Sequence, residues 1–161
     1  MKRKSMAMIL QGILAALAGI CLLFFFVALP RMGRDVAEYA PEYQHMFWPC
    51  LLWAWVFGLP VLVSVVPAWQ IFGTIREKGK PFCVENAQRF RLISLCALAS
   101  GTVLLCGLIV LMIAGLGSAP LFFFAGPIGL AVCAVFGFAC HVMSRLVQET
   151  AEMREENELT V

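Results

Sequence analysis

The sequence predicts an all-α fold: an integral membrane four-helix bundle with both termini in the cytoplasm. The first observation is composition, because 61% of the 161 residues are hydrophobic and 14% are charged, whereas about a quarter of a soluble domain is charged. The second is a set of four uncharged runs, each long enough for the roughly 20 residues with which a helix crosses a bilayer. These runs cover residues 5–29, 47–75, 92–115 and 120–144.

The runs are predicted to be helices because they lack the short apolar–polar alternation of membrane barrel strands. With their polar ends included, the predicted helices cover about 5–29, 47–72, 84–115 and 120–153. No linker, repeat or low-complexity tract separates them. We therefore predict a single four-helix transmembrane domain over residues 1–161.

The first predicted helix follows a basic start, MKRK, of the kind that also begins a signal peptide. The apolar stretch behind it is longer than the central region of a signal peptide, and no convincing A-x-A cleavage site follows. We expect a retained first helix.

The distribution of lysine and arginine predicts the orientation. Only Arg31 and Arg34 lie in the loop before the second helix, and the turn near Gly117 has no basic residue. The other ten are Lys2, Arg3, Lys4, Arg76, Lys78, Lys80, Arg89, Arg91, Arg145 and Arg154. Since basic residues are retained on the cytoplasmic side, both termini and the middle loop are predicted to be cytoplasmic.

The loop PRMGRDVAEYAPEYQHMFW, between the first and second helices, has the pattern of a short surface helix capped by Asp35. Tyr39 and Tyr43 would then share a face of that helix. The two tyrosines are interpreted as interface anchors. The alternative is an outward ligand site built from Tyr39, Tyr43 and His45.

The second helix carries Trp48 and Trp69, which lie 21 residues apart. At about 1.5 Å per residue this separation is about 32 Å, one hydrocarbon thickness, so both are predicted to be interface anchors. Pro60 and Pro67 each remove a backbone hydrogen bond and favour a bend. A gating hinge at Pro60 is the alternative reading.

The stretch REKGKPFCVENAQRFRLIS contains a turn at Gly79 and Pro81, and a helical pattern begins at Cys83. Three side chains are predicted to face lipid or the fourth helix: Phe82, Ala87 and Phe90. Four are predicted to face water and headgroups: Glu85, Asn86, Arg89 and Arg91. Each arginine near anionic headgroups contributes on the order of 1 kcal/mol.

Small residues recur every four positions along the fourth helix, and such spacing lets helices approach closely in lipid. The predicted packing residues are Ala125, Gly129, Cys133 and Gly137. Ala97 and Gly101 on the third helix, and Ala15 and Gly19 on the first, offer matching small surfaces. An internal cavity is the alternative use of this stripe.

The segment 145–161 is predicted to extend the fourth helix past the membrane as an acidic tail. Its acids are Glu149, Glu152, Glu155, Glu156 and Glu158. Arg89 and Arg91 are the expected partners of this tail, through pairs worth less than about 1 kcal/mol each.

The sequence holds no motif for catalysis, a cofactor or a metal. No Asp, Glu, Lys or Arg lies in the middle of a span, which argues against a proton-coupled exporter. His45 and His141 are about a membrane thickness apart, so one haem cannot bridge them. The seven cysteines form no C-x-x-C pair. We predict no enzyme activity, no cofactor, no metal and no direct contact with nucleic acid.

Two stretches, GKPFCVENAQRFRLI and EENELTV, resemble the YoaS-like family of small bacterial membrane proteins with four transmembrane helices and unknown function. The matching residues are Lys80, Pro81, Phe82, Glu85 and Asn86, then Glu156, Glu158, Leu159, Thr160 and Val161. Cys83 replaces the Ser or Thr of the family pattern and caps a helix less well. The resemblance implies a bacterial inner-membrane location and, because members are encoded beside a helix-turn-helix regulator, a regulatory partner.

The functional prediction is a non-enzymatic membrane protein whose cytoplasmic face binds a regulator and anionic lipid headgroups. The candidate contact residues are Lys80, Pro81, Phe82, Glu85, Asn86, Arg89, Arg91, Glu156, Glu158 and Leu159. One alternative is a transporter or channel component, a homo-oligomer bending at Pro60 and Pro127. Another is a lipid-binding membrane scaffold.

Overall fold

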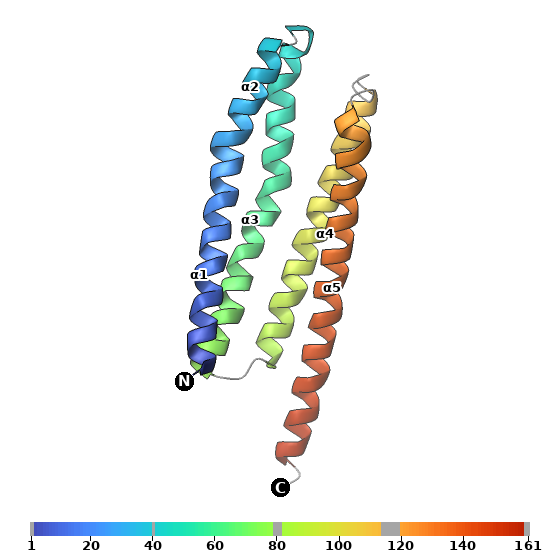
Figure 1. Ribbon diagram of the computed structural model, residues 1–161. Helices are drawn as coiled ribbons and strands as arrows, with labels where there is room; N and C mark the ends of the chain where they lie inside the picture. Colours follow the sequence, from blue (N-terminus) through green and yellow to red (C-terminus); the bar gives the residue numbers. More distant parts are fainter. Residues whose placement is uncertain (1, 40, 79–81, 114–119, 160–161) are drawn as a thin grey trace.

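The computed structural model describes the backbone at residues 2–39, 41–78, 82–113 and 120–159. Side chains are described at residues 5–39, 41, 44–77, 82–113 and 126–153. Throughout these segments the regular structure is helical, which confirms the predicted all-α class. Figure 1 shows long helices running side by side.

The helical elements follow the predicted order. They are α1 (Lys2–Leu23), η1 (Phe24–Ala28), α2 (Leu29–Tyr39), η2 (Pro41–Met46), α3 (Phe47–Lys78), α4 (Val84–Ile113) and α5 (Pro120–Leu159). Four helical segments are long and apolar enough to cross a membrane: Ser5–Tyr39, Gln44–Glu77, Val84–Ile113 and Gly126–Met153. These dimensions are those of a multi-pass membrane protein.

The first helix is longer than the sequence predicted. It passes through a π-helical turn, η1, and continues as α2 to Tyr39, so Asp35 lies inside a helix and does not cap one. A π turn and a proline each interrupt the regular hydrogen bonding of a helix. Here η1 ends one residue before Leu29–Pro30, and the helix continues past both interruptions.

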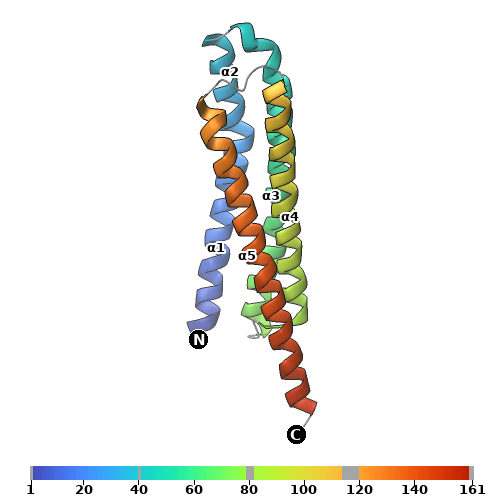
Figure 2. The same cartoon turned by 90° about the vertical axis from the view of Figure 1, so that its right-hand side faces the viewer.

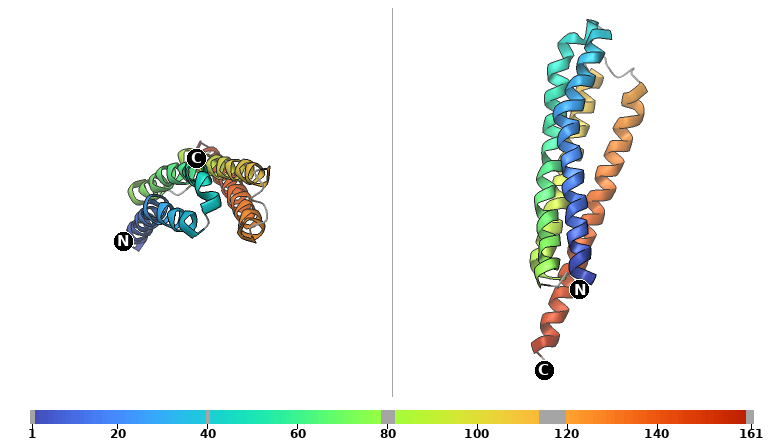
Figure 3. Two further views of the ribbon diagram at one scale, coloured as in Figure 1. Left: turned by 90° about the horizontal axis from the view of Figure 1, so that it is seen from above. Right: turned by 60° about the vertical axis from the view of Figure 1, so that its left-hand side comes forward.

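The helices form an open row in the order α1, α3, α4 and α5. Contacts join α1 to α3, α3 to α4, and α4 to α5, whereas none joins α1 to α4 or α5 among the described residues. Seen end-on, the row follows an arc (Figure 3). The predicted bundle is therefore open along one side, because its first and last helices do not meet.

The α4–α5 pair is held together by small residues. A Cβ atom added at Gly137 would lie 3.4 Å from the Cβ atom of Ala97, and one added at Gly101 would lie 3.3 Å from that of Cys133. One added at Gly129 would lie 2.9 Å from Leu104. These three positions of α5 thus face α4, as small residues do where helices approach closely.

Three predicted packing residues, Ala125 on α5 and Ala15 and Gly19 on α1, are not confirmed. Ala125 lies in α5, but its side chain is outside the described residues. On α1, the prediction that Ala15 and Gly19 form a packing surface is wrong, since Ala15 is exposed and nothing lies within 4 Å of a Cβ added at Gly19. The reason is the open row, which gives α1 one neighbour and leaves its other faces uncovered.

The α1–α3 pair is joined by aromatic side chains. The Trp55 indole N–H donates to the carbonyl oxygen of Phe25, at 3.1 Å, within the π turn. Phe25 packs against Gly58, where an added Cβ atom would lie 2.6 Å from the ring. The π turn is therefore the place where α3 contacts the first helix most closely.

Candidate functional site

Polar side chains connect the helices where α3 ends and α4 begins, here called the basic end because Arg76, Arg89 and Arg91 lie there. Asn86 is completely buried, at 0% exposure. The Nη1 atom of Arg89 donates to Asn86 Oδ1 at 2.8 Å and to Thr74 Oγ1 at 2.6 Å. A longer bond, at 3.4 Å, reaches the carbonyl oxygen of Gln70. Arg89 of α4 is therefore held on α3 by neutral acceptors.

The prediction that Asn86 faces water is wrong. Asn86 lies in the first turn of α4, on a side that neighbouring helices cover, and its amide oxygen is an acceptor for Arg89. Buried polar groups almost always have such partners. Arg89 is partly buried, with its Nη1 atom directed at α3, and its predicted contact with headgroups stays a prediction.

Further side-chain bonds connect the neighbouring helices. The hydroxyl of Ser144 donates to the carbonyl oxygen of Ala87 at 2.7 Å, and that of Ser94 donates to the carbonyl oxygen of Gly137 at 2.8 Å. Both join α4 to α5. Between α3 and α1, Arg76 Nη1 donates to Gln11 Oε1 at 3.3 Å. Each pair of adjacent helices thus has a polar contact in this half of the molecule.

The start of α4 lacks a hydroxyl cap, because Cys83 stands where the family pattern has Ser or Thr. The carbonyl oxygen of Cys83 accepts from the backbone N–H groups of Asn86 and Ala87, at 3.0 and 3.2 Å. Phe82, Glu85 and Arg91 are exposed nearby. Lys80 and Pro81 lie outside the described residues.

α5 extends past the start of α4 at the basic end. The Ser144 hydroxyl bonds to Ala87 near the start of α4, and α5 continues as a helix beyond Ser144 to Leu159. Figures 1 and 2 show this overhang, residues 148–159, continuing past the ends of the other helices. Leu146 and Met153, seven residues apart, are 51% and 57% exposed. Glu149 and Glu152 are exposed beside them.

The acidic tail and the basic middle loop are farther apart than the sequence suggested. α5 is helical to Leu159, so Glu156 lies 12 residues beyond Ser144, about 18 Å of helical rise. Glu156 is therefore too far along α5 to pair with Arg89, and neither Glu149 nor Glu152, whose side chains are described, bonds to it. The side chains of Glu156, Glu158 and Leu159 are outside the described residues.

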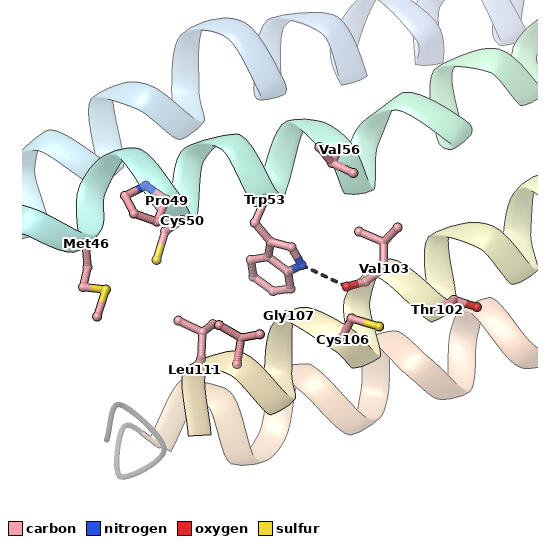
Figure 4. A pocket seen from close by; sticks show the side chains of 11 residues that line it. Met46, Pro49, Cys50, Trp53, Val56, Thr102, Val103, Cys106, Gly107 and Leu111 are labelled. Atoms are coloured by element: carbon pink, nitrogen blue, oxygen red, sulfur yellow. Dashed lines mark hydrogen bonds between the residues drawn. The ribbon is translucent and has the colours of Figure 1, made fainter. Parts of the chain in front are cut away.

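An apolar groove lies between α3 and α4 at the other end of the molecule (Figure 4). Its cavity volume is about 430 Å³, within the range of small-molecule sites. The lining residues include Met46, Cys50, Trp53, Val56, Val103, Cys106 and Leu111. The Trp53 indole N–H donates to the Val103 carbonyl oxygen at 2.9 Å, and the Thr102 hydroxyl donates to the Leu98 carbonyl oxygen at 2.9 Å. Both side-chain donors on the groove are therefore already used.

Sequence reasoning missed this groove. The available signal was Gly107 on α4, because the Trp53 ring occupies the space that a Cβ atom at Gly107 would take. The sequence does not show which residue of α3 lies opposite Gly107, so this glycine alone could not have predicted the groove. Among the other candidates, Tyr39 and His45 are exposed, and the Tyr43 side chain is outside the described residues. No group of three His, Cys, Asp or Glu side chains that could hold a metal ion occurs within the described ranges.

The fold and the site together define a class, the multi-pass helical membrane proteins, with polar contacts at one end and an apolar groove at the other. The chain belongs to a family of proteins of unknown function, DUF2975, which matches residues 31–161. The match begins within α2 and includes α3, α4 and α5. No curated protein and no solved structure matches the chain.

Proposed function

We propose that this chain is a non-enzymatic protein of the bacterial inner membrane whose basic end lies in the cytoplasm and docks a protein partner there. The observation that carries the proposal is the overhang of α5. Met153 on the overhang and Leu146 just before it are both more than half exposed, and Glu149 and Glu152 are exposed on the same helix. Helices with apolar residues at such spacing bind in the grooves of partner proteins.

The partner we propose is a small helix-turn-helix transcription regulator. DNA-binding domains carry basic surfaces, which complement the glutamates of the overhang. The resemblance to the YoaS-like family, whose members are often encoded beside such regulators, supports this choice. The apolar contacts would supply affinity, while the charges would direct association and favour a basic partner.

Co-purification from membranes tests the docking proposal. Full-length protein should retain a DNA-binding regulator, and the double variant Leu146→Ser/Met153→Ser should retain at least about tenfold less, as loss of contacts at an interface centre predicts. The matched control is Gln148→Ala, since Gln148 is exposed on the same helix and its side chain bonds to Glu152 within α5. Retention of no regulator, together with unchanged target transcription in the double variant and in Glu156→Gln, contradicts the proposal.

Thiol labelling of intact cells tests the proposed orientation. Glu77→Cys lies at the basic end and Gln44→Cys at the opposite end, and both positions are exposed. A membrane-impermeant maleimide should label the Gln44→Cys variant above the background of the native cysteines and should leave Glu77→Cys at background until the cells are opened. The reverse pattern contradicts the orientation.

A lipid-binding scaffold is the second candidate, and the α3–α4 groove favours it. Both side-chain donors of the groove are satisfied within the protein, so its walls suit an alkyl chain. Lipids with brominated acyl chains should quench the fluorescence of Trp53, and this part of the quenching should disappear in Trp53→Phe. Equal quenching of the two proteins, after scaling for the lost tryptophan, excludes an acyl chain in the groove.

A further inference from the structure

The guanidinium group of Arg89 is half-buried without a carboxylate partner. Its Nη1 atom makes all three of its hydrogen bonds, to Asn86, Thr74 and the carbonyl oxygen of Gln70. Within the described part of the chain, no carboxylate pairs with it. Neutral acceptors orient a guanidinium but do not neutralise its charge. Because Arg89 is partly withdrawn from water, an anion from outside the described residues would stabilise its charge more than it would a fully exposed one.

The unused part of the guanidinium is its bidentate edge. The Nε and Nη2 atoms make no hydrogen bond to any described residue, and these two nitrogens carry the parallel N–H groups that bind both oxygens of a phosphate or carboxylate. Because Nη1 is anchored on α3, the free edge is held in one orientation before any ligand arrives. Such preorganisation lowers the cost of binding.

The depth of Arg89 selects the kind of anion. Gln70 and Thr74, which hold it, lie at the end of the uncharged part of α3, next to the exposed Trp69. Tryptophans concentrate at the headgroup level of a bilayer. At that level the abundant oxyanion is the phosphate of a lipid. Among the tail glutamates, Glu156 lies about 18 Å beyond Ser144 along α5, and neither Glu149 nor Glu152 bonds to Arg89.

We propose that Arg89 is a specific binding site for the phosphate of an anionic phospholipid at the basic end. Asn86 and Thr74 are positioning residues, because they hold the guanidinium and leave its Nε/Nη2 edge for the headgroup. The site does not depend on the docking of a regulator, which uses the overhang of α5.

Native mass spectrometry of the full-length protein, extracted from vesicles of phosphatidylcholine with a minority of phosphatidylglycerol, tests this site. Wild-type protein should retain one phosphatidylglycerol in preference to phosphatidylcholine. Arg89→Gln should reduce that retention about tenfold or more, as loss of charge-assisted hydrogen bonds predicts. Arg89→Lys should lose most of it, because lysine lacks the fork. The matched control Arg145→Gln, which removes an exposed arginine from α5, should stay within about twofold of wild type.

Thr74 supplies a second test that separates positioning from folding. Thr74→Ser keeps the hydroxyl and should keep the retained lipid, whereas Thr74→Val keeps the shape and should lose lipid selectivity at unchanged helix content by circular dichroism. Equal retention by wild type and Arg89→Gln, or equal losses in Arg89→Gln and Arg145→Gln, overturns the proposal. Displacement of the lipid by millimolar inorganic phosphate, or by a peptide copy of residues 145–161, overturns the assignment to a lipid.

Discussion

The contact between Trp53 and Gly107 determines how closely α3 approaches α4 at the groove. The indole ring of Trp53 occupies the space that a side chain at position 107 would take. Its N–H group donates to the carbonyl oxygen of Val103, one helical turn away on α4. A larger residue at 107 must therefore displace the ring and break that hydrogen bond.

We expect Gly107→Ala to destabilise the protein by about 1–3 kcal/mol, the usual cost of overpacking a contact. Thermal unfolding in detergent, followed by tryptophan fluorescence, measures this change. The control is Gly19→Ala on α1, where nothing lies within 4 Å of the added Cβ atom. Equal melting temperatures for Gly107→Ala and wild type, or an equal loss for Gly19→Ala, contradict this account.

Single residues show where sequence reasoning reaches its limit. The predicted turn at Gly79 and Pro81 lies outside the described residues, while the weak cap at Cys83 follows from local chemistry, which the sequence displays. The burial of Asn86 does not, because it depends on which side of α4 is covered by α3 and α5. Hydropathy predicts that an asparagine close to Arg89 and Arg91 faces water. Asn86 is buried instead because neighbouring helices cover it.

At the scale of elements, the α4–α5 pair depends on small residues along one seam. Gly137 faces Ala97 and the carbonyl oxygen of Ser94, which would lie 3.4 and 3.6 Å from an added Cβ atom. The Ser94 hydroxyl bonds to the Gly137 carbonyl oxygen at the same level. Packing and hydrogen bonding thus both require the two backbones to remain close.

Gly137→Val should push α5 away from α4 and reduce the free energy of unfolding by about 1–3 kcal/mol. The matched control is Ala134→Val, because Ala134 is exposed on the same helix and an added side chain there meets no neighbouring helix. The midpoint of denaturation in a graded detergent series measures both variants. If Ala134→Val is as destabilising as Gly137→Val, the seam is not the cause.

The ends of the helices could be predicted from the sequence where an apolar run gives way to charged or turn-forming residues, but not elsewhere. Charged residues mark the other ends of the four apolar spans, whereas only the Gly- and Pro-containing turn at 115–120 separates the third span from the fourth. The continuation of the first helix through η1 to Tyr39 was not predictable, since Leu29–Pro30 marks a stop in sequence terms. The predicted α5 stripe at Gly129, Cys133 and Gly137 does face α4, because a four-residue period on a helix defines one face without reference to its partner.

The whole molecule is an open row of helices, and this arrangement differs from a closed bundle in a measurable way. In a cysteine-free background, Gln11→Cys with Gly73→Cys should cross-link with a short bifunctional maleimide. Position 73 lies next to Gln11, whose Nε2 atom would be 3.8 Å from an added Cβ atom. Ile13→Cys with Val142→Cys, two exposed positions on α1 and α5, should not cross-link within one chain.

Gel mobility distinguishes a link within one chain from a link between two chains. An intramolecular product from the Ile13 and Val142 pair would show that α1 meets α5 and that the row closes. The open arrangement was beyond sequence reasoning, because the apolar runs on α1 and α5 are equally compatible with lipid and with a fourth helix–helix contact.

The open row also bears on how the chain reaches its folded state during synthesis. Every contact between membrane-spanning segments in the described structure joins neighbours along the chain. Assembly can therefore proceed in the order in which the segments leave the ribosome, with each new helix docking on the one before it. No step requires the last segment to find the first, so the closure entropy of the longest loop is never incurred.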